Sequence, residues 1–414
     1  MPNFDLHAAY DEASDALRLR VIDSPAGQTK QAIRSEALTP LWPEINLYAL
    51  TRLDWNRLKE VGGALREMLL PGSIWGLWRE SLGRAGAEGL RLRVRPADAS
   101  AASLPWELIY DVERNEFPAL NIDTPVVYYL EGPIPARPRT EQLPATLSVL
   151  LTGADSDSER PLDISTELDR VAAALRPLTD NGKASVTRID ALRAHRLQTA
   201  LLQQKPHIFH FAGHGEWDAD AQSGALLLVG EGDPDRLQTD FLATVLRGSS
   251  VKLVILNACD SAPDNDQLWS GMAQALVLAG LPAVVAMRTL VSDRAATAFA
   301  ELFYTAVAAG EPLDRAMTHA RQAVMGRTMN GEWLAPALFL RAGDARLWAE
   351  PEAKPTETTP GQGRQTVGGI HIGNVNATNF VTGDATINQR GSTFNVGGGS
   401  TGPSTGGSGA DESS

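Results

Sequence analysis

Cysteine is nearly absent from this sequence, whose 414 residues include only Cys259. A single thiol excludes an internal disulfide and any metal site that needs several cysteines. The sequence also lacks an uninterrupted apolar run of about 18 residues, the length that a membrane-spanning helix requires. Its first residues, MPNFDLHAAYDEASD, lack the basic and apolar regions of a signal peptide. We therefore expect a cytoplasmic protein with no membrane segment.

Positively charged residues are also fewer than negatively charged ones. The sequence has 37 Lys and Arg against 50 Asp and Glu, a formal net charge of −13. Nucleic acids and anionic membranes would repel such a chain, so the expected partners are proteins or small molecules. Hydrophobic residues make up 43% of the sequence, enough to fill substantial cores in a chain of this length.

Strand-like and helix-like patterns alternate through residues 146–350. The expected strands are LSVLLTG (147–153), ASVTRID (184–190), HIFHFAG (207–213), VKLVILNA (251–258) and AVVAM (283–287), with helices between and after them. This alternation predicts an α/β fold with a mostly parallel sheet flanked by helices. Functional sites on such sheets lie beyond the carboxyl ends of the strands.

The residues before this core are more mixed. Residues 1–95 combine short alternating segments with a helix expected over 50–70, which predicts a small N-terminal α+β module. Residues 96–145 form a pre-core segment and a proline-rich link, in which SLPWELIYD (103–111) has the composition of a strand.

The C-terminal region divides into three parts. Residues 351–366 are rich in Pro, Thr and Gly without periodicity, which is typical of a flexible linker. In residues 367–399, apolar side chains alternate with Asn, Thr and Gly, which predicts a β-forming repeat tail. Residues 400–414 have low complexity, and we expect them to be disordered. The apolar tail positions are Ile370, Ile372, Val375, Phe380, Ile387, Phe394 and Val396.

Two strand ends carry the residue types of nucleophilic catalysis. VILNACDSA places Cys259 directly after an apolar strand, and HFAGHG places His214 between glycines at the end of the preceding large strand. A cysteine needs a base to become an effective nucleophile, and a nearby histidine would supply one. Flanking glycines let backbone amides approach a reacting carbonyl. Ser261, later in the same turn, is an alternative nucleophile with no evident base.

A structural interpretation competes with this one. A lone cysteine at a strand end is commonly buried filler. His207 opens its strand and His210 lies inside it, so both are expected to pack or hydrogen-bond within the fold. Of the three histidines between residues 207 and 214, only His214 lies in a turn.

Four blocks of sequence together resemble one family. HFAGHG, VILNACDSA, the segment 280–324 and WLAPALFL (333–340) are similar, in that order, to the CHAT family of caspase-like cysteine peptidases. SLPWELIYD also resembles a segment that precedes the core in these proteins. The resemblance implies a caspase-like fold in which Cys259 is the nucleophile, His214 is the general base, and the backbone amides of Gly215 and Cys259 form the oxyanion hole. It implies no metal and no cofactor.

The chain departs from the family pattern near the expected substrate pocket. Asn257 occupies the position, two before the cysteine, that is acidic in metacaspases, while Asp260 beside the nucleophile could lend negative charge. Arg288 begins a segment in which many relatives have an aromatic residue. We take Asn257, Asp260 and Arg288 as pocket candidates, and the cleavage preference stays open. Asp293 is expected to cap the following helix.

The expected function is that of a cysteine endopeptidase that cleaves a protein substrate in a bacterial defence or stress-signalling system. The tail is expected to recruit the protease to a sensor or NTPase-type partner that bears a matching segment, and self-assembly is a further expectation. The alternative, from a different class, is a catalytically idle caspase-like scaffold that acts by assembly alone.

Overall fold

The computed structural model describes residues 1–34, 46–132, 141–155, 163–218, 223–231, 233–258, 266–341 and 343–349, and four short strands between residues 366 and 386. Two compact units make up the chain, Met1–Pro351 and Glu352–Ser414. The first unit contains the sheet, the helices and the candidate site.

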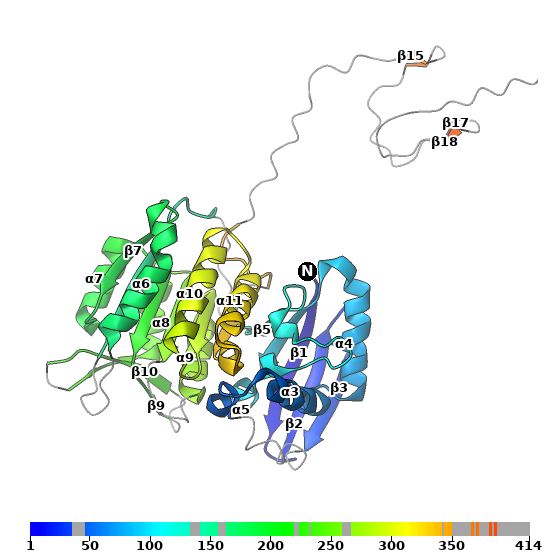
Figure 1. Cartoon of the computed structure of the whole chain (residues 1–414), viewed down its shortest axis with the longest axis horizontal. Coiled ribbons are helices and arrows are strands. Elements are labelled where there is room, and N and C mark those ends of the chain that lie inside the picture. The colour runs from blue at the N-terminus through cyan, green and yellow to red at the C-terminus, as the bar shows by residue number, and fades with distance from the viewer. Residues whose placement is uncertain are drawn as a thin grey trace, which may run out of the picture. The chain divides into compact units, whose positions relative to one another are not determined.

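An eleven-stranded sheet runs through the first unit in the order β3-β2-β1-β4-β5-β14-β13-β12-β8-β6-β7. Figure 1 shows its N-terminal strands in blue and its later strands in green to yellow. In sheet order the strands are β3 (Thr29–Arg34), β2 (Ala16–Asp23), β1 (Asn3–Asp11), β4 (Arg91–Pro96), β5 (Val126–Tyr129), β14 (Pro336–Leu340), β13 (Ala283–Met287), β12 (Leu253–Ala258), β8 (Ile208–Gly213), β6 (Leu147–Ala154) and β7 (Ala184–Ile189).

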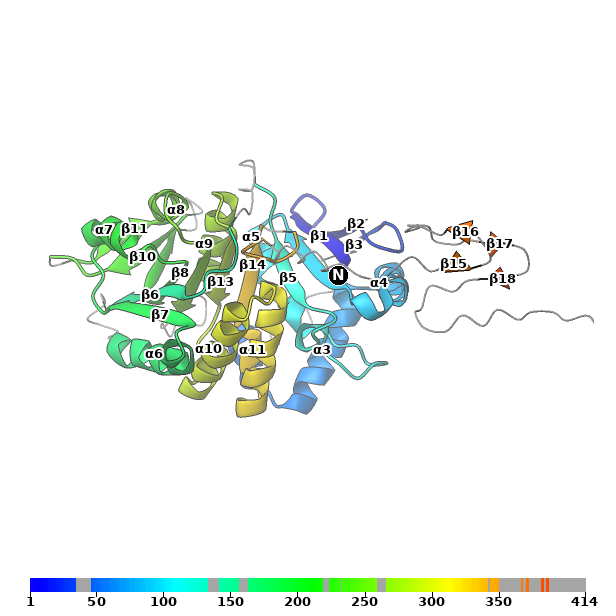
Figure 2. The ribbon, with the colours of Figure 1, turned by 90° about the horizontal axis from the view of Figure 1, so that it is seen from above.

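Strands β7, β6, β8, β12 and β13 are mutually parallel, and β14 is antiparallel to β13. The two central strands of this half are buried along their described lengths, because helices cover both faces. Figure 2 shows α6, α10 and α11 on one face and α7, α8 and α9 on the other. These helices are α6 (Ile164–Asp180), α7 (Ala194–Gln204), α8 (Thr239–Arg247), α9 (Asp266–Leu278), α10 (Asp293–Ala308) and α11 (Leu313–Thr328). The expected α/β class and mostly parallel sheet are confirmed.

A small second sheet lies beyond the end of β8. It joins β9 (Gly215–Asp218), β10 (Ser223–Leu228) and β11 (Asp235–Gln238) in antiparallel pairs. The remaining elements of this unit are α2 (Leu47–Leu50), α3 (Trp55–Leu69), α4 (Gly72–Ala85) and α5 (Ala99–Ser103), with 3₁₀ turns η1 (Gly86–Glu88), η2 (Trp106–Leu108), η3 (Pro118–Leu120) and η4 (Gly331–Leu334).

The helix expected over residues 50–70 begins later than its apolar spacing indicated. The Asp54 carboxylate accepts hydrogen bonds from the backbone N–H groups of Asn56 and Arg57, and this cap starts α3 at Trp55. Its end before Pro71 agrees with the expectation, because proline cannot continue a helix.

SLPWELIYD was expected to form a strand, and this prediction was wrong. The backbone N–H of Leu108 bonds to the carbonyl of Pro105, so the chain turns locally as η2. Trp106 is fully buried and its indole N–H donates to the Ala101 carbonyl at 2.8 Å. The strand-like composition of this segment therefore reflects the burial of its side chains and not membership of a strand.

Residues 1–351 form one compact unit. The reason lies in strand pairing: β4 pairs with β5, and β5 pairs with β14 of the core. These pairs join segments that are far apart in sequence. Local composition does not report such pairing.

A buried group of charges also holds the two halves together. The Glu107 carboxylate accepts hydrogen bonds from Arg288 at 2.9 Å and from Arg321 at 3.1 Å, and all three side chains are almost completely inaccessible to solvent. Arg288 also donates to the Tyr128 hydroxyl at 2.9 Å. Because a buried charge is costly unless it is paired, Glu107 is the anion on which both guanidinium groups depend.

The described residues of the second unit form two short hairpins. β15 (Thr366–Val367) pairs with β16 (Ile370–His371), and β17 (Val381–Thr382) pairs with β18 (Ala385–Thr386). Both hairpins lie in the segment 367–399, or at its border, that was expected to form strands. The apolar positions from Ile372 to Phe380 and from Ile387 onward, the linker at 351–365, and residues 400–414 lie outside the described residues.

We predict that Glu107→Ala lowers the free energy of unfolding by about 3–5 kcal/mol, because it leaves two buried guanidinium groups unpaired. Chemical denaturation measures this change. Glu113→Ala is the matched control, since Glu113 pairs with Arg79 on the surface, where both side chains are more than half exposed, at 62% and 54%. The control should change stability by less than about 0.5 kcal/mol. Equal effects of the two substitutions would contradict the role given to Glu107.

Candidate active site

The candidate site lies where β8 and β12 leave the carboxyl edge of the sheet. These strands are parallel neighbours, and their register pairs Gly213 with Ala258. His214 is the next residue after Gly213, and Cys259 is the next residue after Ala258. The chain segment 259–265, which includes Asp260 and Ser261, lies outside the described residues. The described part of the site is therefore the histidine side and the strand that leads to the cysteine.

His214 occupies the turn between β8 and β9, and its side chain is 1% exposed. Its carbonyl accepts a hydrogen bond from the backbone N–H of Leu227 in β10 at 3.0 Å, which ties the turn to the small sheet. A Cβ at Gly213 would lie 2.8 Å from the Ala154 carbonyl oxygen, and a Cβ at Gly215 would lie 3.1 Å from the Leu268 side chain. The glycines around His214 thus meet a packing requirement, in addition to the expected access for backbone amides.

The other two histidines have structural roles, as expected. His207 Nδ1 accepts a hydrogen bond from the backbone N–H of Ser148 at 3.0 Å. His210 is buried within β8, and its Nδ1 lies 2.8 Å from the Tyr304 hydroxyl of α10. Burial lowers the pKa of His210 to about 4, because the interior disfavours the charged imidazolium.

Asn257, the pocket candidate on β12, is buried and donates from its amide nitrogen to Glu167 Oε1 at 2.6 Å. Glu167 lies on α6, whose first turn follows β6 at the same edge of the sheet. Burial raises the pKa of Glu167, an effect that the nearby Arg170 guanidinium opposes. A carboxylate is therefore present beside Asn257, supplied by a helix and not by the strand.

Sequence reasoning missed Glu167. Its place in the first turn of a helix after a parallel strand indicates the correct edge of the sheet. The face of the helix that meets β12 depends on packing, so no local signal selects Glu167 among the polar residues of that turn.

Arg288, a third pocket candidate, follows β13 but points into the interior. It is 1% exposed, and its guanidinium donates to Glu107, to Tyr128 and to the Leu334 carbonyl. Contact with a substrate would require these bonds to break. We therefore leave Arg288 out of the pocket proposed below.

Asp293 was expected to cap α10, but the cap is its neighbour. The Ser292 hydroxyl accepts a hydrogen bond from the backbone N–H of Ala295 at 3.3 Å. Asp293 occupies the first helical position, and its carboxylate pairs with Arg170 at 2.8 Å. The first turn of a helix favours such a negative charge.

Among the described residues, no group of three or more His, Cys, Asp or Glu side chains is arranged to hold a metal ion. Of the helices described above, none combines the length and the apolar character needed to cross a membrane.

Comparison with known proteins gives one family match. The family model of the CHAT domain matches residues 59–351. No curated protein matches the chain.

Solved structures with a similar chain path include separase in its complex with securin from Saccharomyces cerevisiae, with a TM-score of 0.43 and 11% identity over 82% of this chain. The chain spans 30% of that separase. Gingipain R, an Arg-specific cysteine proteinase, has a TM-score of 0.38 and 11% identity, with 76% of each chain covered. The complex of its pro- and mature domains from Porphyromonas gingivalis has a TM-score of 0.39 and 10% identity, covering 76% of this chain and 78% of that one.

The buried His210 predicts how stability depends on pH. Its pKa is about 4 in the folded chain against 6.5 in the unfolded chain. The unfolded state therefore binds the proton first, and about 3 kcal/mol of stability is lost as the pH falls from 6.5 towards 4. Urea denaturation at several pH values should show this loss in the wild type and a shallower slope in His210→Gln. His195→Gln, which changes an exposed histidine, should keep the wild-type slope, whereas identical slopes in all three proteins would refute the assignment.

Proposed function

The chain belongs to the CHAT domain family, and from this premise we propose that it is a cysteine endopeptidase with Cys259 as nucleophile and His214 as general base. The observation that carries the proposal is the pairing of Gly213 with Ala258 in adjacent parallel strands. Neighbouring strands lie about 4.8 Å apart. From such a registered pair, the next residue of each strand would leave the sheet beside the other, an arrangement that suits proton transfer between an imidazole and a thiol.

The proposed reaction is acyl transfer to the thiol followed by hydrolysis. His214 takes the proton of the Cys259 thiol, and the thiolate sulfur attacks a peptide carbonyl to form a carbon–sulfur bond. The backbone amides of Gly215 and Cys259 are the proposed donors to the resulting oxyanion. As the carbon–nitrogen bond breaks, His214 returns its proton to the leaving amine. A water molecule, deprotonated by His214, then cleaves the thioester and restores the thiol.

Asn257 and Asp260 are the proposed contributors to the substrate pocket from the β12 side. The hydrogen bond between Asn257 and Glu167 supports adding Glu167 to them. Burial raises the pKa of Glu167, the hydrogen bond from Asn257 opposes this effect, and that bond holds the carboxyl group against the proposed pocket residue. Glu167 is therefore a candidate for setting which side chains this part of the site accepts.

An activated thiol should react quickly with iodoacetamide at pH 6.5, well below the pKa of an ordinary cysteine. Because Cys259 is the only cysteine in the sequence, the amount of label reports on this residue alone. We expect alkylation of the wild type to be about tenfold faster than that of His214→Ala, since the imidazole raises the thiolate fraction. His195→Ala, at an exposed histidine on α7, is the matched control and should react like the wild type.

Equal, slow alkylation rates in all three proteins would favour the alternative function, a catalytically idle scaffold that acts by assembly alone. Cleavage of a peptide library, with Cys259→Ala as control, then identifies the substrate preference. Hydrolysis that survives Cys259→Ala would point instead to Ser261 and overturn the cysteine mechanism.

The tail is the proposed recruitment element, which would bring the protease to a sensor or NTPase-type partner in a bacterial defence or stress-signalling system. The short antiparallel pairs β15–β16 and β17–β18 support a strand-forming role for this region. A strand-forming segment can pair with a like segment on a partner, and recruitment raises the local concentration of the protease.

Replacing Ile372, Val375 and Phe380 together with lysine should abolish assembly and leave the cleavage of short peptides unchanged, because the tail lies outside the catalytic unit. Lysine at Asn374, Asn376 and Thr378 is the matched control, since it adds the same charge at polar positions of the same segment. Analytical ultracentrifugation of the tail-bearing chain and a peptide assay measure the two properties. Loss of both properties, or of neither, would contradict modular recruitment.

A further inference from the structure

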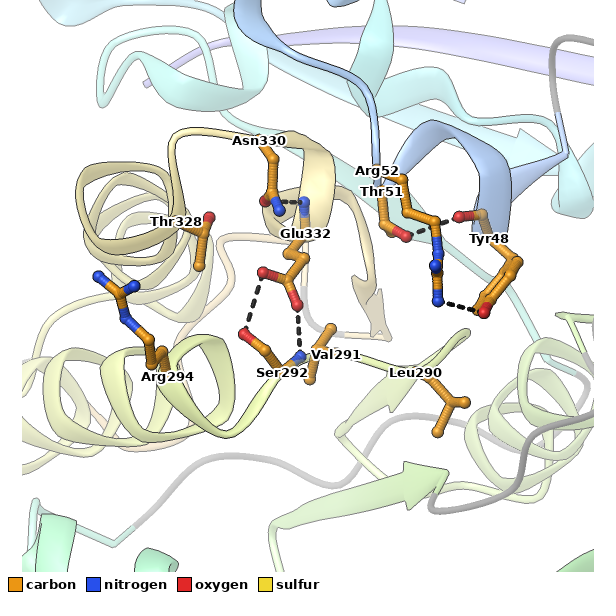
Figure 3. A pocket seen from close by; sticks show the side chains of 10 residues that line it. All are labelled: Tyr48, Thr51, Arg52, Leu290, Val291, Ser292, Arg294, Thr328, Asn330 and Glu332. Carbon is orange, nitrogen blue, oxygen red and sulfur yellow. Dashed lines mark hydrogen bonds between the residues drawn. The ribbon is translucent and has the colours of Figure 1, made fainter.

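A cavity of about 550 Å³ opens beyond the carboxyl end of β13. Its walls come from three segments that are distant in sequence: α2 with the residues after it, the turn from Leu290 to Ser292, and the region around η4. Figure 3 shows Arg52 lying against Tyr48 on one side, with Glu332 directed at Ser292 on the other. The residues Tyr48, Thr51 and Arg52 precede residue 59, where the family match begins.

The register of the sheet relates this cavity to the candidate site. β12 and β13 are parallel, and Leu256 pairs with Ala286. Cys259 is the third residue after Leu256, and Leu290 is the fourth residue after Ala286. The cavity therefore begins beyond β13, on one side of β12, whereas His214 follows β8 on the other side of β12. A peptide residue spans about 3.3 Å when extended, so a substrate that crosses this edge of the sheet would pass the cavity within a few residues of the cleaved bond.

Among the described residues, Glu332 is the one acidic side chain that lines the cavity, and its carboxylate is already hydrogen-bonded. Glu332 is 8% exposed, and its carboxylate accepts hydrogen bonds from the backbone N–H of Ser292 and, at 3.0 Å, from the Ser292 hydroxyl. The Asn330 side chain accepts from the Glu332 backbone N–H at 3.1 Å. These bonds fix the turn after β13 against η4, so this wall of the cavity is pre-organised.

The remaining charges on the walls are positive. Arg52 stacks on the Tyr48 ring, with its guanidinium carbon 4.2 Å from the ring centre, and donates to the Tyr48 hydroxyl. Arg294 donates to the Arg327 carbonyl at 2.8 Å. A guanidinium group has five N–H donors, so these bonds orient each arginine and leave it capacity for an anion. In a chain with a net charge of −13, a cavity lined by two arginines favours a negatively charged occupant.

We propose that this cavity binds a carboxylate side chain, Asp or Glu, of the protein substrate and so selects where the chain cuts. Arg52 and Arg294 lie on different walls of the cavity (Figure 3), and each is a proposed donor to a substrate carboxylate. Leu290 and Val291 offer an apolar surface to the methylene groups of that side chain. The inference rests on the proposed peptidase function, because it assigns a specificity pocket to that same site.

The test compares peptides that differ only by Asp against Asn, or Glu against Gln, near the cleaved bond. The wild type should cleave the acidic peptide with a kcat/KM about tenfold higher, the size of effect that one charge-assisted hydrogen bond supplies. The preference should fall to about twofold or less in Arg52→Gln/Arg294→Gln and partly recover in Arg52→Lys/Arg294→Lys, which keeps the charge but not the planar fork. Arg79→Gln, at an exposed arginine of α4, is the control and should keep the full preference.

Two results would overturn the inference: no acidic preference in the wild type, or a full preference in the double glutamine variant. The single variants, each at an exposed arginine, replace the double variant if circular dichroism shows that it does not fold, and each should then reduce the preference.

A binding measurement distinguishes a failure of this inference from a failure of the proposed function. Fluorescence anisotropy of the same labelled peptides with Cys259→Ala requires no turnover. If acidic peptides bind more tightly in a way that depends on Arg52 and Arg294, but the wild type cleaves none of them, the pocket would be supported and the peptidase function contradicted. Cleavage without such selectivity would keep the peptidase and reject the pocket.

Discussion

The parallel pairing of β8 with β12 is the constraint from which the functional interpretation follows. Both strands are buried, and their register cannot slip without moving every side chain to the opposite face of the sheet. This register brings Gly213 and Ala258 side by side. The residue after each is the histidine or the cysteine of the proposed dyad. Close packing around Gly213 and Gly215 then leaves little room for the turn that carries His214 to adopt another path.

A second constraint makes the N-terminal residues part of the same unit. β4 and β5 extend the sheet from β14, and Glu107 pairs with two arginines that come from the end of β13 and from α11. Removal of Glu107 would leave both guanidinium groups without an anion in the interior. The pre-core segment thus acts as a structural partner of the turn after β13. Through Ser292 and Glu332, that same turn shapes the cavity that we propose for substrate selection.

The charges around the site divide between two regions at the carboxyl edge of the sheet. The acidic side chain of Glu167 lies against Asn257 on the α6 side, whereas Arg52 and Arg294 line the cavity beyond the carboxyl end of β13. A substrate that spans both regions would meet opposite charges at different points along its length. Opposite charges of this kind fix the direction and register of a bound peptide more than they add to its affinity.

Periodicity, turn residues and composition determined the five parallel strands of residues 146–350, the helices between and after them, and the two strand ends that precede His214 and Cys259, because these features depend on neighbours along the chain. They did not determine the small antiparallel sheet of β9, β10 and β11 or the pairing of β14. They did not determine that SLPWELIYD turns as a 3₁₀ helix, that Arg288 points inward, or that Glu167 lies beside Asn257. They also gave no sign of a cavity that joins Arg52 to Arg294. Those features depend on which distant segments share a buried interface, and the choice among such interfaces is made by packing and by the pairing of buried charges. Tertiary structure alone decided them.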